Sequence, residues 1–260
     1  VDVEHPDLKG QVIENQNLLA ELSPSFNSDK HGTAVAGVIA AKSNNKNGII
    51  GIAPKARLVA LKACWPEKPD AMEADCNSFS LALAINAAIK IGVDVLNMSL
   101  VGPEDPLLTA LLNKAIEDGM LVVAAGSGEQ SGENNFPASM ENVLSVESVR
   151  KTSRVHQAAA SPILAQGDQV LTTMPHGTYD FISGHSIAAA EVSGIVALLL
   201  ELKREQQPSD IRNILFKSTI NNAQGIASGI DVNAALSGVC DHAGCANEAL
   251  SLNIHKLLPN

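Results

Sequence analysis

Basic residues are scarce in this sequence, and long apolar runs are absent. Eighteen Lys and Arg stand against 28 Asp and Glu, which gives a formal net charge of −10 at neutral pH. Such a surface repels phosphate backbones and anionic lipid, so we expect no nucleic-acid partner. The densest apolar stretch, Ile195 to Leu200, is followed at once by Glu201. Because a membrane helix needs roughly 18 to 20 apolar residues, we expect no membrane span.

The sequence also lacks an initiator methionine, a charged and apolar leader, internal repeats and low-complexity linkers. We therefore expect that residues before Val1 have been removed. The composition, 45% hydrophobic and 18% charged, is that of a soluble globular protein and not of a disordered chain. A length of 260 residues suits one compact domain.

Cysteine occurs only four times, as two local pairs: Cys64 with Cys76, and Cys240 with Cys245. This pattern favours two disulfides and a secreted or periplasmic location. Four reduced thiols in the cytosol remain the alternative. Neither pair has the two-residue spacing of a zinc knuckle, so we assign no metal ligands.

Short apolar runs alternate with segments of helical periodicity. The runs predict strands buried on both faces, as in a parallel sheet, and the amphipathic segments predict crossover helices. Strands are expected at Ala56–Ala63, Asp94–Leu100, Leu121–Gly126 and Val143–Val149, and helices at Ser78–Ile91, Pro106–Asp118, Ser186–Glu205 and Ser209–Ser218. This order indicates an α/β fold with a doubly wound, mostly parallel sheet and helices on both faces.

Two segments carry residues suited to nucleophilic catalysis. His31 leads the run Gly32 to Gly37, which is rich in small residues and opens an apolar helix. An imidazole at that position is suited to proton transfer near neutral pH. Ser186 follows a glycine and begins a long helix, whose N–H groups stabilise developing negative charge. Alone, each would more simply be a structural histidine or an N-cap serine.

Together these segments resemble the subtilase family, whose histidine box reads H-G-T-x-V-A-G and whose serine box reads G-T-S-x-A-x-P. The histidine box is matched completely. Further stretches fit in the family's order: His5-Pro6-Asp7-Leu8, Gly51-Ile52-Ala53-Pro54, Leu96-Asn97-Met98-Ser99-Leu100 and Phe136-Pro137-Ala138. The resemblance covers residues 1–238, which we take as the peptidase domain, with residues 239–260 as a tail held by the second cysteine pair.

The resemblance implies a serine endopeptidase in which His31 is the base and Ser186 the nucleophile, the two side chains meeting at one edge of the sheet. In the family the catalytic aspartate lies seven residues before the histidine that corresponds to His5. That position falls before Val1, so we expect a longer parent protein to supply the aspartate. Asp2 is interpreted as a surface residue and Asp7 as structural. A propeptide and a peptide or protein substrate are the expected partners.

Several residues depart from the family's pattern. Ser127 stands where the family has its oxyanion asparagine, which predicts weakened activity if the hydroxyl cannot reach the oxyanion. Val101 stands where the family usually has glycine, which predicts a narrow P1 pocket unless the valine faces the core. His185 replaces a threonine and is interpreted as a neighbour of the site.

The implied substrate-binding residues are Ser99, Leu100, Val101, Gly102 and Gly126. No cofactor is expected, although Asp7 with the loop from Ser43 to Gly48 offers oxygen ligands that would suit calcium. Two other functions stay open. One is a catalytically impaired subtilase-fold protein that binds peptide. The other is an α/β-hydrolase esterase, suggested by the elbow around Ser186, in which His242 or His255 would be the base.

Overall fold

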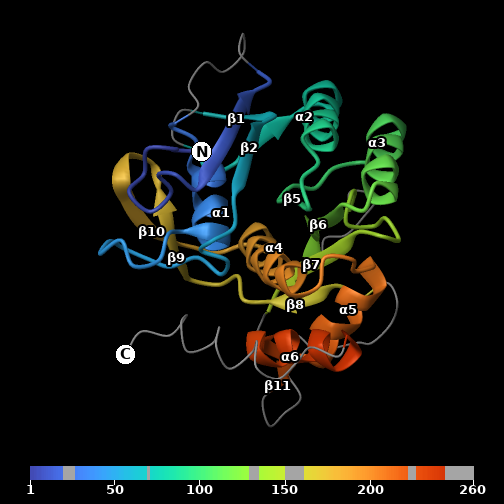
Figure 1. The fold of residues 1–260 in the computed structure, drawn as a ribbon. Helices are drawn as coiled ribbons and strands as arrows, with labels where there is room; N and C mark the ends of the chain where they lie inside the picture. Colours follow the sequence, from blue (N-terminus) through green and yellow to red (C-terminus); the bar gives the residue numbers. More distant parts are fainter. Residues whose placement is uncertain (20–26, 69–70, 129–134, 150–160, 222–226, 244–260) are drawn as a thin grey trace.

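The computed structural model describes residues 1–19, 27–68, 71–128, 135–149, 161–221 and 227–243 (Figure 1). The main sheet has four parallel strands in sequential order: β5 (Val95–Met98), β6 (Leu121–Ala125), β7 (Leu144–Ser148) and β8 (Ile163–Ala165). All five residues of β6 are buried because helices cover both faces of the sheet. Three of the four predicted strands are found in this sheet as β5, β6 and β7, each a little shorter than its apolar run.

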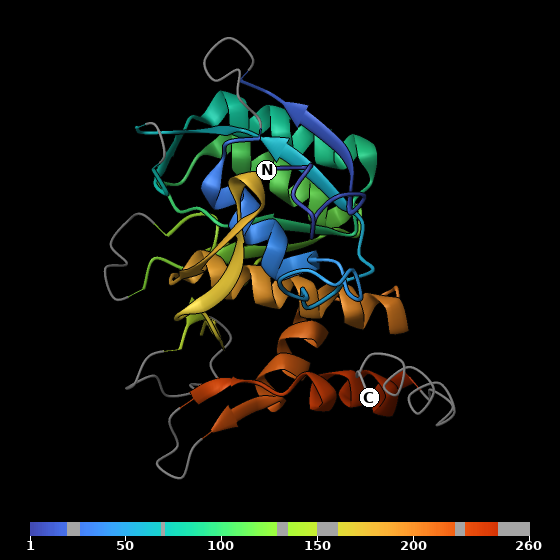
Figure 2. The same ribbon diagram turned by 90° about the vertical axis from the view of Figure 1, so that its left-hand side faces the viewer.

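Alternate residues of β6 face different layers. Val122 and Ala124 pack against α2 (Ser78–Ile91) and α3 (Pro106–Glu117), whereas Val123 packs against α4 (His185–Leu202). Two views at right angles show α2 and α3 on one side of the sheet and α4 on the other (Figures 1 and 2). This arrangement confirms the doubly wound α/β fold.

The capping signals place the ends of these helices. Asn77 and Asp105 cap α2 and α3 by accepting hydrogen bonds from backbone N–H groups of the first turn. Gly92 ends α2 in the left-handed conformation, with φ of 74°, which glycine adopts without a steric penalty. Both helices therefore begin and end within one residue of their predicted bounds.

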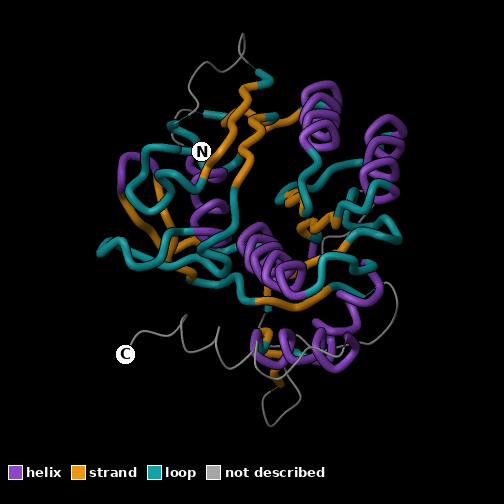
Figure 3. The backbone as a smooth tube through the Cα atoms, viewed as in Figure 1, coloured by secondary structure: helices purple, strands orange, loops and turns teal. Residues whose placement is uncertain are grey.

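The predicted single sheet is divided. A second parallel pair, β1 (Val12–Asn17) with β2 (Leu58–Lys62), forms its own two-stranded sheet, and no described strand pairs β2 with β5 (Figure 3). The N-terminal helix α1 (Lys30–Ala40) packs against α4 through a small apolar cluster that includes Ala34 and Ala190. The strands β2 and β5 thus each present an unpaired edge.

Several shorter elements were not predicted as such. They are the hairpins β3 (Cys64–Pro66) with β4 (Ala74–Cys76), β9 (Val170–Met174) with β10 (Thr178–Ile182), and β11 (Thr219–Asn221) with β12 (Ala227–Ile230). The 3-10 turn Pro175–Gly177 joins β9 to β10. Helix α5 (Pro208–Lys217) agrees with its prediction. Helix α6 (Val232–Ala243) continues beyond residue 238, across the predicted boundary between the peptidase domain and the tail.

Two further points concern burial. Asp2 is 5% exposed and accepts hydrogen bonds from the N–H groups of Glu4 and His176, so its interpretation as a surface residue was wrong. In the described part of the chain, α4 is the one helix long and apolar enough to cross a membrane. Because 61% of that stretch is buried inside the protein, α4 has the character of a core helix.

Candidate active site

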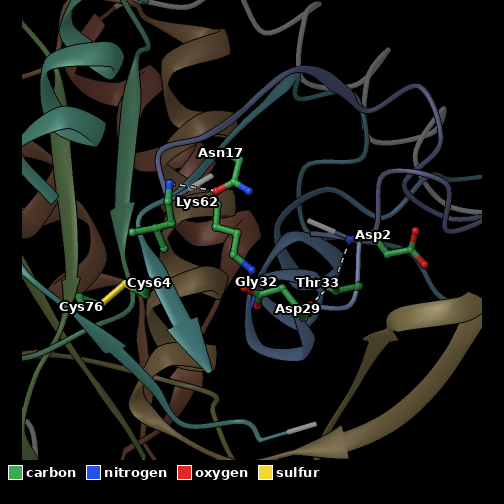
Figure 4. Close-up of polar contacts among 9 residues, drawn as sticks. Asp2, Asn17, Asp29, Gly32, Thr33, Lys62, Cys64 and Cys76 are labelled. Atoms are coloured by element: carbon green, nitrogen blue, oxygen red, sulfur yellow. Dashed lines mark hydrogen bonds and ion pairs between the residues drawn. A yellow bond between two sulfur atoms is a disulfide. The ribbon is translucent and has the colours of Figure 1, made fainter. Parts of the chain in front are cut away.

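His31 is the second residue of α1, and the residue that begins this helix sets its surroundings. Asp29 is the N-cap, and its Oδ1 accepts a hydrogen bond from the N–H of Gly32 at 2.9 Å. Its Oδ2 lies 3.5 Å from Nζ of Lys62, the last residue of β2. Figure 4 shows Asp29, Gly32 and Lys62 together at this point. The start of α1 is therefore held at the carboxyl end of β2.

The small residues behind His31 allow α1 to lie directly on β9. A Cβ added to Gly37 would come within 2.2 Å of Oγ1 of Thr173, so only glycine fits without a shift. The hydroxyls of Thr172 and Thr173 donate hydrogen bonds of 2.7 Å to the carbonyl oxygens of Ala34 and Thr33. The last glycine of the histidine box, Gly37, therefore allows the close packing that holds α1 in place.

Ser186 lies in the first turn of α4. Gly184 precedes the helix with φ of 158°, and its carbonyl accepts a hydrogen bond from the N–H of Ile187. The Ser186 hydroxyl donates to the carbonyl oxygen of Ser99 at 3.3 Å, and the Ser99 hydroxyl donates to the carbonyl oxygen of Ser186 at 2.9 Å. The start of α4 and the end of β5 are therefore joined by reciprocal hydrogen bonds.

A series of side-chain hydrogen bonds extends this connection further along α4. Ser193 donates to Oδ1 of Asn97 at 2.9 Å, and Nδ2 of Asn97 donates to the hydroxyl of Ser99 at 2.9 Å. Asn97 was predicted only as part of a motif, and Ser193 was not predicted to belong to the site. The chain fixes the register between the strand end and the helix that carries Ser186.

His31 and Ser186 line one cleft, of about 2320 Å³, that extends between β2 and β5. The other predicted site residues that line it are Ser99, Leu100, Val101, Gly102, Gly126 and Ser127. The predicted site residues, which come from four separate segments, thus line the same large cleft. Among the described residues no hydrogen bond joins His31 to Ser186, and the serine hydroxyl instead donates to the carbonyl oxygen of Ser99 at 3.3 Å.

Burial lowers the pKa of the His31 imidazole below its ordinary value of 6.5, and the negative charge of Asp29 partly opposes this. The lowered pKa keeps the ring neutral at pH 7, the form that accepts a proton. Asp29 itself is occupied by Gly32 and Lys62, so its carboxylate acts on the ring through its charge.

Ser127 follows β6 and lies in the same cleft. Its hydroxyl oxygen is buried and has no hydrogen-bond partner among the described residues. Its backbone N–H donates to Oδ1 of Asn135 at 2.9 Å. Asn135 was not predicted to belong to the site; its side chain holds Ser127 from eight residues further along the chain.

The segment after β5 forms one wall of the cleft. Gly102 exchanges two backbone hydrogen bonds with Phe136, of 2.9 and 3.1 Å, which hold the segment extended. The side chain of Val101 is 47% exposed and lines the cleft, so the alternative in which it faces the core is not adopted. Leu100 packs inward against the core beside α2 and α3.

The carboxylate of Asp7 is fully buried and surrounded by donors. It accepts hydrogen bonds from Nδ2 of Asn45 at 2.6 Å, the N–H of Ile49 at 3.0 Å and the hydroxyl of Tyr179 at 2.8 Å. A calcium ion needs oxygen acceptors directed at it, whereas these groups direct hydrogens at the carboxylate. The Asp7 carboxylate is thus satisfied by these three donors, and the described chain contains no group of three or more His, Cys, Asp or Glu residues arranged for a metal.

The first predicted disulfide is present. Cys64 and Cys76 are bonded across the β3–β4 hairpin, next to the end of β2 (Figure 4). The second pair lies outside the described side chains, because Cys245 is not among the described residues and only the backbone of Cys240 is described.

The fold and the cleft define a class: an α/β protein with a serine at one helix start and a neutral histidine at another, typical of serine hydrolases. The chain belongs to the subtilase family, whose model matches residues 1–238. It is 34% identical over 218 residues to the major intracellular serine protease of Bacillus subtilis (strain 168), covering 78% of this chain and 66% of that protein. It is 32% identical over 226 residues to subtilisin DY of Bacillus licheniformis, covering 84% and 79%.

Solved structures agree. The prenylagaramide maturation protease PagA superposes with a TM-score of 0.71 at 25% identity, over 92% of this chain and 90% of that one. Fervidolysin from Fervidobacterium pennivorans, a keratinolytic enzyme related to subtilisin, gives a TM-score of 0.72 at 26% identity, over 91% and 41%. The matched relatives are thus serine proteases. The match to this chain spans 66% of the length of the first of them.

Proposed function

We propose that the protein is a serine endopeptidase in which Ser186 attacks the peptide carbonyl and His31 takes its proton. The observation that carries this proposal is that both side chains line one cleft, each at the start of a helix and each braced by a neighbouring strand. In this proposal the Ser186 hydroxyl leaves the carbonyl oxygen of Ser99 and turns towards His31 when substrate binds. Such tightening is common when substrate binds, because catalytic hydrogen bonds are often loose in the free enzyme.

The carboxylate that orients His31 comes, in this proposal, from a strand outside these 260 residues. The facing edges of β2 and β5 both line the cleft and have no strand between them among the described residues. Unpaired backbone groups at a sheet edge favour an added strand. Val1 also lines the cleft, and its side chain lies beside Gly32, next to His31. A strand leading into Val1 would therefore end beside the imidazole.

The proposed oxyanion donors are the N–H at the start of α4 and the Ser127 hydroxyl, which has no hydrogen-bond partner among the described residues and would turn from its buried position into the cleft. Ser127→Ala should therefore lower kcat about tenfold or more with little change in KM, because the interaction forms only in the transition state. An unchanged kcat would exclude Ser127 as a donor.

The substrate is proposed to be an extended peptide that pairs with the segment Ser99–Gly102. Val101, exposed in the cleft, narrows the space beside the P1 side chain, so small P1 residues are preferred. Val101→Gly should raise kcat/KM for peptides with Phe at P1 relative to Ala at P1. Rapid cleavage after Phe or Tyr by the unchanged protein would refute the preference.

A secreted or periplasmic location, with activation from a propeptide, completes the proposal. The Cys64–Cys76 disulfide supports an oxidising compartment. The relatives include both an intracellular protease and a subtilisin, so they do not decide the location. Intact mass with and without reductant, measured on the protein from its native source, tests it.

The decisive experiment is labelling of Ser186 by a fluorophosphonate probe, using the chain together with the residues that precede Val1 in its parent protein. Labelling should be lost in Ser186→Ala and kept in Ser228→Ala, which changes an exposed serine in β12. His31→Ala should slow labelling by several orders of magnitude. If the folded chain binds peptide but is never labelled, the hydroxyl held by Ser99 favours the alternative of a non-catalytic peptide-binding protein.

A further inference from the structure

The β3–β4 hairpin forms part of the wall of the cleft that contains His31 and Ser186. One residue, Ala63, separates it from β2, and one residue, Asn77, separates it from α2. The Cys64–Cys76 disulfide joins the two strands at this base (Figure 4). The hairpin residues that line the cleft are Cys64, Glu67, Glu73, Ala74, Asp75 and Cys76. The disulfide therefore lies in the wall itself, and none of the proposed catalytic steps uses it.

The hairpin also packs against the start of α1. It shares a small cavity of about 150 Å³ with residues 28–31, the segment that leads into α1 and includes His31. The hairpin residues that line this cavity are Pro66, Ala71, Met72 and Ala74. Met72 packs in addition against the apolar cluster in which α1 meets α4. The position of the hairpin therefore bears directly on the surroundings of the imidazole.

The base of the hairpin is connected to the substrate side of the cleft as well. Ser78, two residues after Cys76, donates its hydroxyl hydrogen bond to the carboxylate of Asp105. Asp105 caps α3 and lies three residues after Gly102, the end of the proposed substrate segment. A movement at Cys76 is thus two residues away from a bond that holds the loop after this segment.

The backbone pairing of the hairpin is too short to hold it by itself. Its two strands have three residues each, and among the described strands they pair with each other and with no larger sheet. One of the six paired residues is Pro66, which has no N–H to donate. An isolated two-stranded hairpin is at best marginally stable in water. The disulfide, which restricts the open forms of this loop, therefore contributes most of the constraint at its base.

The disulfide is also open to reduction. Cys64 and Cys76 are only partly buried, and both line the cleft, so a thiolate can reach them. A dithiol supplies the two electrons and two protons that the reaction needs. Its first thiolate attacks one sulfur to give a mixed disulfide, and its second thiolate displaces that sulfur. The products are two cysteine thiols, at positions 64 and 76, and the oxidised dithiol.

We propose that the Cys64–Cys76 disulfide is a redox switch, which holds the β3–β4 hairpin in the wall of the cleft when oxidised and releases it when a dithiol reduces it. This inference rests on the proposed protease function and makes the disulfide a condition of full activity. The chain would be weakly active among cytosolic dithiols and fully active where disulfides form. The release is local, because the clusters around β6 include no residue of the hairpin.

The test uses the chain together with its upstream residues, before and after reduction by dithiothreitol, with the thiols counted by mass. Trp65, the one tryptophan of the sequence, lies next to Cys64 in β3 and reports on the hairpin. Reduction should shift its emission and lower kcat/KM several-fold, and reoxidation should restore both. The double variant Cys64→Ser with Cys76→Ser should have the low activity with or without reductant. The control, Cys240→Ser with Cys245→Ser, should respond as the unchanged protein does.

Amide hydrogen exchange separates local release from general loosening of the fold. Reduction should speed exchange several-fold in β3, in β4 and at residues 28–32, and should leave β6 unchanged. The inference is overturned if kcat/KM stays the same after complete reduction. It is also overturned if exchange in β6 rises in parallel, since the disulfide would then serve only overall stability. If Ser186 is labelled by fluorophosphonate in neither redox state, the protease proposal fails, whereas Trp65 emission and exchange still decide whether the disulfide holds the hairpin.

Discussion

Replacing Asp29 by asparagine separates two effects of this carboxylate on the histidine. Asparagine is as good an N-cap as aspartate, so the start of α1 is kept. The negative charge that raises the pKa of His31 is removed, so burial acts alone and the pKa falls further below 6.5. Because catalysis needs the neutral ring, the acidic limb of the kcat/KM profile should move to lower pH.

The structure also gives the cost of the change. The Lys62 side chain is 4% exposed, and in Asp29→Asn it loses a carboxylate 3.5 Å away. Loss of a charged partner at a buried site costs roughly 1–3 kcal/mol. Asp29→Ala removes the cap as well, which adds about 1 kcal/mol. For a domain of this size, each kcal/mol lowers Tm by about 2–4 °C.

The assay is the rate of fluorophosphonate labelling of Ser186 from pH 4 to 8, together with thermal unfolding of each variant. Asp118→Asn, which removes an exposed carboxylate on the surface of α3, is the control and should change neither curve appreciably. The reasoning is refuted if the acidic limb of Asp29→Asn stays in place or moves to higher pH. It is also refuted if the asparagine and alanine variants are equally stable, since the cap would then contribute nothing.

Two further predictions concern stability. Gly37→Ala places a Cβ 2.2 Å from Oγ1 of Thr173. This substitution should lower the free energy of unfolding by roughly 1–3 kcal/mol, as measured by urea titration. A stability equal to that of the unchanged protein would show that α1 does not need this close contact with β9. Tyr179→Phe removes one of three donors from the buried Asp7 carboxylate and should lower the free energy of unfolding by about 1–3 kcal/mol. Added chelator should leave Tm unchanged in both proteins. A fall in Tm on chelation would show that a cation, and not this donor set, stabilises the loop.

The crossover helices and central strands were predictable because their signals are local. The Asn77 and Asp105 caps and the glycine after α2 mark helix ends within a few residues of sequence. The apolar run at β6 reflects burial on both faces, which any parallel sheet between helices imposes. Short hairpins such as β9–β10 escaped prediction because their pairing depends on contacts with α1, far away in the sequence.

The residues of the candidate site also fall into those that local motifs predicted and those that they did not. His31 and Ser186 were identified from motifs, whose small residues and glycines are required by the close packing seen at Gly37. Asn135 and Ser193 were missed because each acts on a segment distant in sequence through one side-chain hydrogen bond. Asp2 was misplaced because a polar residue near a chain end is usually exposed, and its burial depends on the N–H of His176 in the turn between β9 and β10.

The sequence by itself determined the secondary structure of the central layers, the family and the two residues placed at helix starts, because periodicity, caps and motif spacing are written along the chain. Only the tertiary structure decided that Asp7 is enclosed by hydrogen-bond donors and that β2 and β5 face each other across an open cleft. Those features depend on how distant segments pack, since burial and the partners of a polar group are properties of the folded whole.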